Sequence, residues 1–300
     1  MKNQAINYSV IIPHYNSPKL LARCLASIPE REDIQVIVVD DCSKPDIVEF
    51  SHLPGHGRPN TEVYQTPYGG SAGRARNVGL DHAKGKWLLF ADADDFYTPQ
   101  AWNLFDKYLD SEADIIYFGL TSADSDTLMP TERHKAFDQF VQAYAAEPTQ
   151  ENEKWLRYRH DVPWGKLIRR GLVVEQGIRF GETRYYNDTL FSCNCAISAR
   201  AIAAESKEAY CVTDSNCSLT KQMSPDALII RLTVTCTKNQ ILRRHNLREY
   251  QMPILFYLRM GWKLSPRLFF KLILIGIQFN SSWCMEIKRW VLRKHTKSTR

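Results

Sequence analysis

Residues 8–41 read YSVIIPHYNSPKLLARCLASIPEREDIQVIVVDD, and this stretch decides the fold class. Its two ends, 8–13 and 34–41, are short β-branched apolar runs without alternation, which is typical of strands buried on both faces of a parallel sheet. Between them, apolar residues recur at helical spacing over 20–28, after Ser17-Pro18 as cap and first turn. A strand, a helix and a second strand within about thirty residues predict a βαβ unit.

The same alternation continues to about residue 120. We expect further strands at 62–65, 86–91 and 114–120, with helices at 71–83 and 100–109. This pattern predicts an α/β fold with a mostly parallel sheet flanked by helices, whose ligands bind beyond the carboxyl ends of the strands. The later rhythm differs: 135–180 is expected to be mainly helical, 188–203 a helix, 209–214 a short strand, and the chain from 225 onward helical.

A length of 300 residues and a mass of 34.7 kDa allow one large domain or two ordinary ones. The apolar share of 44% and the charged share of 24% exclude a disordered, collagen-like or coiled-coil protein. We expect a catalytic domain over 1–220, with a nucleotide-binding half at 1–120 and an acceptor half at 121–220. Residues 221–300 are expected to form a helical, amphipathic C-terminal region.

The positive charge is concentrated at the C-terminal end. The chain carries +6, but residues 250–300 hold ten Lys and Arg and one acid, Glu286, so that stretch is +9 and the remainder −3. Residues 268–279 are very apolar but shorter than the ~20 residues that span a bilayer. With Trp262, Trp283, Trp290 and basic flanks, this region favours helices lying in an anionic membrane interface. A helical subdomain packed on the core is the second interpretation and a nucleic-acid patch the third.

No apolar signal segment precedes the first strand, which predicts a cytoplasmic protein on the inner face of the membrane. The eight cysteines, at positions 24, 42, 193, 195, 211, 217, 236 and 284, are then expected to be free thiols. A zinc site formed by the four cysteines at 193–217 is disfavoured, because C-x-C followed by C-x5-C is not a common zinc spacing.

Acidic residues follow directly on the strand at 86–91, in the order Asp92, Ala93, Asp94, Asp95. Carboxylates at a strand end repel one another unless a cation joins them, and Asp-x-Asp offers oxygen ligands to one hard divalent ion. A solvated acidic turn is the alternative. The second Asp-x-Asp, Asp124 and Asp126, stands away from its strand and is predicted to be only a turn.

Two further features border the same edge of the predicted sheet. Asp40 and Asp41 lie at the end of the second strand, and Pro13 and Tyr15 lie at the end of the first. A carboxylate and an aromatic ring at adjacent strand ends are suited to binding a nucleoside. The alternative is that they serve as a helix cap and a packing residue. The Gly-rich stretch 69–77 brings backbone N–H groups, Arg74 and Arg76 toward the site, which suits a diphosphate. The alternative is a flexible loop with solvated arginines. Dinucleotide and P-loop motifs do not occur.

Four segments in order resemble the inverting glycosyltransferases of family 2, which have the GT-A fold. They are SVIIPHYN (9–16), VVDDCS (38–43), G-x-ARN-x-G (73–79) and FADADDF (90–96). YYNDTLF (185–191) is similar to the acid-containing segment near the acceptor, and WGKLIRRG (164–171) to a segment of bacterial members. Two positions depart from the pattern: Cys42 replaces a Gly, and Asn187 replaces a Glu.

The resemblance implies the following roles. Asp41 would bind a uracil-like base, with Pro13 and Tyr15 lining its pocket. Asp92 would face the ribose and the metal, and Asp94 would be the main protein ligand of Mg²⁺ or Mn²⁺. Asp188 would be the general base, although Asn-Asp before an apolar helix is also a good N-cap. Arg76 would either touch the diphosphate or brace Asp94.

The expected function is therefore metal-dependent transfer of one sugar from a nucleotide-diphosphate donor, UDP-linked by resemblance, to a hydroxyl of a growing surface glycan such as lipopolysaccharide or capsule. The expected partners are this nucleotide sugar, a glycan or lipid-linked acceptor and an anionic membrane surface, and nucleic acid is not among them. The competing class is a non-catalytic protein that binds a nucleotide sugar, or a basic adaptor at the membrane.

Overall fold

The computed structural model describes residues 5–215 and 222–279, and the chain divides into two compact units, Met1–Ser218 and Leu219–Arg300. The first unit contains β1 (Tyr8–His14), α1 (Pro18–Ala26), β2 (Ile34–Asp40), η1 (Phe50–His52), β3 (Thr61–Gln65), α2 (Ala72–His82), β4 (Trp87–Phe90), β5 (Phe96–Tyr97), α3 (Ala101–Lys107), β6 (Ile115–Asp124), α4 (Lys135–Ala146), α5 (Gln150–Arg159), β7 (Lys166–Arg169), α6 (Arg170–Glu175), α7 (Thr189–Ser198) and β8 (Ile202–Asp214). The second contains α8 (Pro225–Arg244), η3 (Arg248–Tyr250), α9 (Leu255–Leu264) and α10 (Pro266–Gln278).

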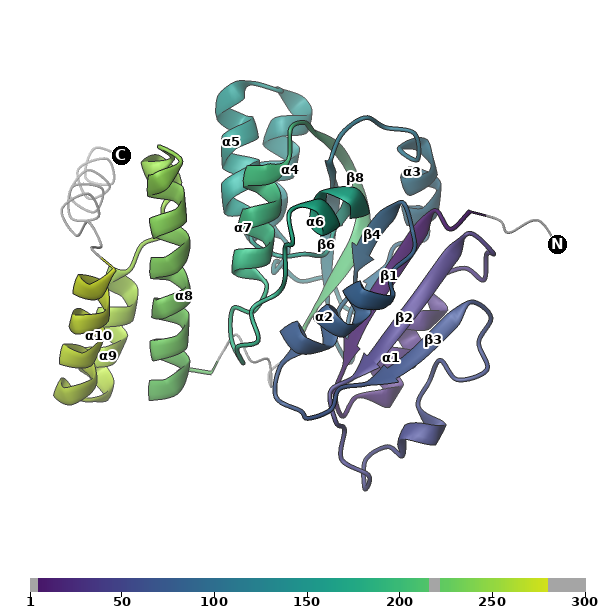
Figure 1. Ribbon diagram of the computed structural model, residues 1–300, viewed down its shortest axis with the longest axis horizontal. Coiled ribbons are helices and arrows are strands. Elements are labelled where there is room, and N and C mark those ends of the chain that lie inside the picture. The colour runs from purple at the N-terminus through teal and green to yellow at the C-terminus, as the bar shows by residue number, and fades with distance from the viewer. Residues whose placement is uncertain (1–4, 216–221, 280–300) are drawn as a thin grey trace. The chain divides into compact units, whose positions relative to one another are not determined.

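The strands of the first unit form one sheet in the order β3-β2-β1-β4-β7-β6-β8-β5 (Figure 1). β3, β2, β1 and β4 are parallel, as the βαβ pattern predicts. β7 is antiparallel to both of its neighbours, so β6 and β8 run in the same direction as β4, and β5 is antiparallel to β8. The predicted fold class, α/β with a mostly parallel sheet between helices, is confirmed.

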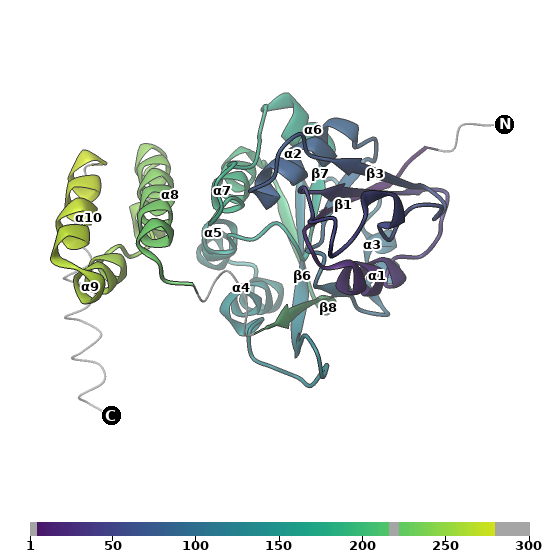
Figure 2. The same ribbon diagram turned by 90° about the horizontal axis from the view of Figure 1, so that it is seen from below.

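Both faces of this sheet are covered, which explains why its strands are apolar without alternation. Val10 and Ile12 of β1 join the core under α1 and α3, whereas Ile11 between them joins the core on the other face, with residues of α2 and α7. Figure 2 shows α1 and α3 on one side of the sheet and α2 and α6 on the other. Because β3, β2, β1 and β4 are parallel neighbours, their carboxyl ends lie at one edge of the sheet.

Two glycines hold α2 close to its neighbours. A Cβ at Gly79 would lie 2.4 Å from Cγ2 of Ile11 in β1, and a Cβ at Gly73 would lie 2.0 Å from the Gly181 carbonyl oxygen. Such distances exclude a side chain at either position. The two glycines of the 73–79 segment thus seat α2 against β1 and against the chain near residue 181.

The later part of the first unit differs from what the local pattern predicts. Within 135–180, a strand (β7) interrupts the expected helices, and the helix expected over 188–203 ends at Ser198. β8 begins at Ile202, seven residues before the expected strand at 209–214. The first half of β8 is polar and partly exposed, and pairing with β6 makes it extended, so its own sequence carries little strand signal.

In the second unit, α8, α9 and α10 confirm the helices expected after residue 225. Ser265 caps α10 by accepting a hydrogen bond from Leu268 N, and Pro266 is the first residue of that helix. In the described ranges no helix combines the length and apolar character that crossing a membrane requires. The six described cysteines are free thiols, as expected. Cys217, Cys284, Trp283 and Trp290 lie outside the described residues.

Candidate active site

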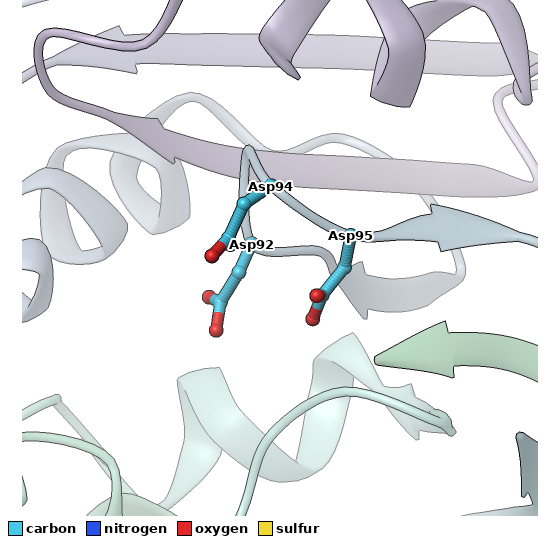
Figure 3. Close-up of side chains that lie close together, drawn as sticks. All are labelled: Asp92, Asp94 and Asp95. Atoms are coloured by element: carbon cyan, nitrogen blue, oxygen red, sulfur yellow. The ribbon is translucent and has the colours of Figure 1, made fainter. Parts of the chain in front are cut away.

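Three carboxylates extend from the loop that follows β4. Ligand oxygens of Asp92, Asp94 and Asp95 all lie within 4.8 Å of one another, and their side chains point to the same side of the loop (Figure 3). Asp95 is buried, and its two oxygens accept hydrogen bonds from the Tyr210 hydroxyl at 2.9 Å and from Thr213 N at 2.6 Å. Asp95 therefore fastens the loop to the end of β8.

Asp94 is the member of this group whose carboxylate is available to a ligand. In the residues that the structure describes, it accepts no hydrogen bond from another residue, while its backbone oxygen accepts from Arg23 Nη2 at 2.6 Å and from Thr213 Oγ1 at 2.9 Å. Burial, and then the charge of Asp92, raise the pKa of the Asp94 carboxyl to about 6. A bound cation would relieve this repulsion, so the donor set fits a hard divalent metal held by Asp94 and Asp92.

The second Asp-x-Asp forms a turn, as predicted, but β6 continues to Asp124, so the expectation that these acids stand away from their strand is wrong. Asp124 is the last residue of β6, and its Oδ1 accepts from Asp126 N, Thr127 N and Thr127 Oγ1. Asp126 is exposed. The Asp124 carboxylate is thus occupied by its own turn.

Arg76 on α2 links the metal-side loop to the start of α7. Its Nη2 donates to Asp92 Oδ1 at 2.5 Å, and its Nη1 donates to Asn187 Oδ1 at 2.7 Å. The guanidinium is buried and lies 5.3 Å from the centre of the Phe180 ring. The sequence-based alternative that Arg76 braces Asp94 is wrong, because α2 points this side chain at Asp92.

Asp188 immediately precedes α7, but its side chain makes no capping hydrogen bond. This rules against the N-cap interpretation of the residue. Burial raises the pKa of Asp188 to about 6, with Arg76 acting to lower it and Asp92 to raise it further. A carboxylate that makes no capping hydrogen bond in the described residues, and whose pKa is raised toward neutrality, is suited to accept a proton.

At the other end of the edge, Asp41 is buried and orders the Gly-rich loop. Its Oδ1 accepts from Thr66 Oγ1 at 3.0 Å, and its Oδ2 accepts from Gly70 N at 2.8 Å and Ser71 N at 2.7 Å. A carboxylate has about four acceptor positions, so one position on Oδ1 remains for a ligand. Ser71 in turn caps α2 by accepting from Gly73 N.

Pro13 and Tyr15 flank this position. Pro13 is buried within β1, while Tyr15 follows the strand and is 51% exposed, so its ring is available for stacking. Cys42 has φ +59°, in the left-handed region that favours glycine. This geometry fits the Gly that the resemblance implies at this position.

Asp40 has a structural role. It accepts a hydrogen bond from His14 Nδ1 at 2.8 Å and another from Ser43 N at 2.9 Å, and His14 Nε2 accepts from Ser17 N. Burial acts to raise the pKa of Asp40, but these hydrogen bonds outweigh it and leave that pKa lowered. These contacts join the ends of β1 and β2 through the side chains of His14 and Asp40.

The local pattern did not point to several residues that shape the site. Tyr210 donates to Asp95 and accepts from Asp92 N, Thr213 supports both Asp94 and Asp95, and Arg23 reaches the Asp94 carbonyl. Asn77 was visible inside the 73–79 segment, and it exchanges two hydrogen bonds with the backbone of Phe180. The others come from α1 and β8, far away along the chain, so no local signal marks them.

Comparison with known proteins identifies the family. Residues 9–176, more than half of the chain, match the profile described as glycosyl transferase family 2, and the chain belongs to this family. The sheet and its helices have the GT-A fold seen in solved glycosyltransferases. The protein is thus a glycosyltransferase by family.

Two relatives illustrate the similarity. TarS of Staphylococcus aureus, a poly(ribitol-phosphate) beta-N-acetylglucosaminyltransferase, is 26% identical over 68% of this chain and 35% of its own length. A poly(ribitol-phosphate) beta-glucosyltransferase of Bacillus spizizenii is 33% identical over 36% of this chain and 18% of its own. The chain therefore spans about a third or less of these relatives.

Among solved structures, TarS 1–349 with UDP-GlcNAc superposes with a TM-score of 0.65 at 22% identity, over 91% of this chain and 81% of that one. The mannosyltransferase PcManGT of Pyrobaculum calidifontis, in complex with GDP-Man and Mn²⁺, superposes with a TM-score of 0.55 at 13% identity, over 99% of this chain and 81% of that one. At these identities the likeness concerns the fold alone.

Proposed function

We propose that this protein is an inverting, metal-dependent glycosyltransferase that moves one sugar from a UDP-linked donor to a hydroxyl of a bacterial surface glycan. The observation that carries the proposal is that the site contains two carboxylates suited to different tasks, Asp94 and Asp188, and that Arg76 links the segments that carry them. On one side Asp94 is free to bind a cation beside Asp92, and on the other Asp188 is free to accept a proton.

The donor would lie along the edge formed by the ends of β1, β2 and β4. Asp41 accepts from the base through its remaining lone pair, Tyr15 stacks on it and Pro13 closes the pocket. Asp92 faces the ribose and the diphosphate side. The guanidinium of Arg76 fixes the orientation of the Asp92 carboxylate through a hydrogen bond.

Asp94 and Asp92 would hold Mg²⁺ or Mn²⁺, since hard divalent cations prefer carboxylate oxygens. When bound, such an ion neutralises the negative charge that grows on the diphosphate as the bond to the sugar breaks. Asp95 keeps the loop in place through Tyr210 and Thr213.

Asp188 would act from the acceptor side. Its carboxylate takes the proton of the acceptor hydroxyl, the oxygen attacks the anomeric carbon, and the bond to the diphosphate breaks on the opposite face, which inverts the configuration. Arg76 sets the position of this segment through Asn187 Oδ1. Asn187, at the position where the resemblance implies Glu, gives Arg76 a neutral partner beside the carboxylate of Asp92.

The named activities of TarS and of the Bacillus spizizenii enzyme support a polyol-phosphate or related surface glycan as the acceptor class, alongside lipopolysaccharide and capsule. The UDP-GlcNAc bound to TarS supports a UDP-linked donor. We also propose a lipid-linked acceptor and a cytoplasmic location, peripheral on the inner face of the membrane, because the C-terminal helices are apolar and basic.

A screen of UDP-, GDP- and CMP-linked sugars for nucleotide release with Mn²⁺ tests the proposal. We expect release from a UDP-sugar that requires the metal and that increases when a glycan acceptor is added. A protein that is stabilised by a UDP-sugar but releases no UDP with any acceptor would instead be a nucleotide-sugar-binding protein, which is the competing function.

A further inference from the structure

Exposed apolar side chains gather on two short helices of the second unit. Six of the twelve large hydrophobic side chains that are exposed in the described residues lie on α9 and α10, helices of 10 and 13 residues. The six are Phe256, Trp262, Leu264, Phe270, Leu274 and Ile277. Soluble monomers rarely expose apolar surface at this density without a partner.

α10 has two distinct apolar stripes. Leu268, Leu272 and Gly276 are buried. α10 packs against α9 (Figure 1), and Leu272 Cδ1 would lie 2.5 Å from a Cβ at Gly261 of α9. On the outer side, Phe270, Leu274 and Ile277 follow the i, i+4, i+7 spacing of a single helix face and are 61%, 66% and 61% exposed. The apolar outer stripe is therefore not the one used for packing within the unit.

Cations border this apolar stripe. Arg267 and Lys271 are exposed on α10, and Arg259 and Lys263 are exposed beside Trp262 on α9. No Asp or Glu occurs between residues 250 and 279. We refer to these four cations and the six exposed apolar side chains as the α9–α10 face. Its uncharged members are large apolar side chains, and its charged members are all cations.

We propose that the α9–α10 face binds the surface of a bilayer that contains anionic phospholipids, with α10 lying in the plane of the interface and its outer stripe turned toward the lipid. Large apolar and aromatic side chains insert at the acyl boundary, and Lys and Arg remain at the level of the headgroups. α10 is too short to span the bilayer. The inference builds on the membrane location in the proposed function, but its test requires no catalysis.

Charge argues against two other occupants. A symmetric contact between two copies would place the same cationic face against itself, and like charges repel. A nucleic acid would satisfy the cations but would leave Leu274 and Ile277 in water, because aliphatic side chains offer no surface on which bases stack. An anionic bilayer satisfies both halves of the face.

Sedimentation of the full-length protein with vesicles tests the inference. We expect strong binding to phosphatidylcholine vesicles that contain phosphatidylglycerol, weak binding to phosphatidylcholine alone, and partial release at high salt. The double variant Phe270→Ser/Leu274→Ser should lower the vesicle affinity at least ~10-fold. Lys263→Gln/Lys271→Gln should lower it about 5-fold per side chain, on anionic vesicles only.

Met129→Ser/Val174→Ser is the matched control, because both side chains are about equally exposed, at 66% and 60%, but belong to the first unit. It should leave vesicle binding unchanged, and every variant should bind UDP like the parent protein. The inference is overturned if the intact protein ignores anionic vesicles, if the control variant loses binding equally, or if light scattering shows a dimer that Phe270→Ser/Leu274→Ser dissociates without any vesicle binding. Loss of UDP binding with intact vesicle binding would count against the proposed function alone.

Discussion

Asp188 stands immediately before α7 without capping it, and its pKa is raised to about 6 mainly by burial. A general base must be deprotonated to act, so the rate is lost as the pH falls through this value. We expect kcat/KM to rise about tenfold per pH unit below pH 6 and to level off above it. A pH–rate profile with saturating metal measures this limb.

Asp188→Asn keeps the size of the side chain but removes the proton acceptor. Transfer should fall by at least ~10²-fold, while the affinity for UDP remains that of the parent. Near-normal transfer would contradict the role of base. Two other acids, Glu182 and Asp214, are weaker candidates for the general base. Glu182 forms an ion pair with Arg74 at 3.0 Å, and Asp214 lies 4.0 Å from Arg133.

The same substitution should stabilise the fold. The pKa of Asp188 is higher in the folded protein than its ordinary value of 3.8, so the carboxyl contributes least to stability once it is ionised in both states. The destabilisation caused by ionising the Asp188 carboxyl in the folded protein is absent below about pH 4 and complete above pH 6. Asp188→Asn should therefore raise the free energy of unfolding by ~1 kcal/mol at pH 8, with a smaller gain at acidic pH, measured by denaturant titration.

Asp94 and Asp126 form a second comparison between single residues. Asp94→Ala should abolish turnover and remove the stabilisation of the protein by Mn²⁺ with UDP, because it deletes the carboxylate that is free to bind the cation. Asp126→Ala should do neither, since its side chain is exposed in a turn. Thermal shift with and without Mn²⁺ and UDP distinguishes them, and equal loss in both variants would exclude Asp94 as the chief ligand.

At the scale of the elements, the seat of α2 decides where Arg76 and Asn77 point. Gly79 contacts Ile11 so closely that an added methyl group must displace α2 or β1. Gly79→Ala should therefore lower the free energy of unfolding by ~1–3 kcal/mol and shift Arg76 away from Asp92. Denaturant unfolding and the affinity for UDP measure the two effects.

Gly171→Ala in α6 is the control for this prediction. Its nearest neighbour is Glu175 Oε1 at 3.4 Å, an ordinary contact with the end of a flexible side chain. In a helix, Ala is favoured over Gly, so this variant should be neutral or more stable by up to ~1 kcal/mol. A similar loss in both variants would mean that the close approach to β1 is not what Gly79 serves.

At the scale of the whole molecule, every residue of the candidate site belongs to the first compact unit, which ends at Ser218. A chain that ends after residue 221 should fold and bind UDP with Mn²⁺ like the full-length protein. Circular dichroism and calorimetric titration check this expectation. An unfolded fragment, or one with UDP affinity lowered more than ~10-fold, would show that the second unit is part of the catalytic fold.

The sequence by itself determined the parallel half of the sheet and the position of its acids. Unalternating β-branched runs such as 8–13 and 34–41 form buried strands, and a carboxylate that directly follows such a run must lie at the carboxyl edge of the sheet. Asp41, Asp92 and Asp94 were located in this way, because strand formation and strand ends are local properties of the chain.

Only the tertiary structure decided which of these groups are free. β8 becomes extended over its polar half because β6 pairs with it, and this strand brings Tyr210 and Thr213 to Asp95. Arg76 donates its hydrogen bond to Asp92 and not to Asp94, and Gly79 fixes the position of α2 close to β1 from which this side chain extends. Asp188 is partly buried and makes no capping hydrogen bond to α7. Hydrogen-bond partners and burial depend on residues up to about a hundred positions away, and no local pattern carries that information.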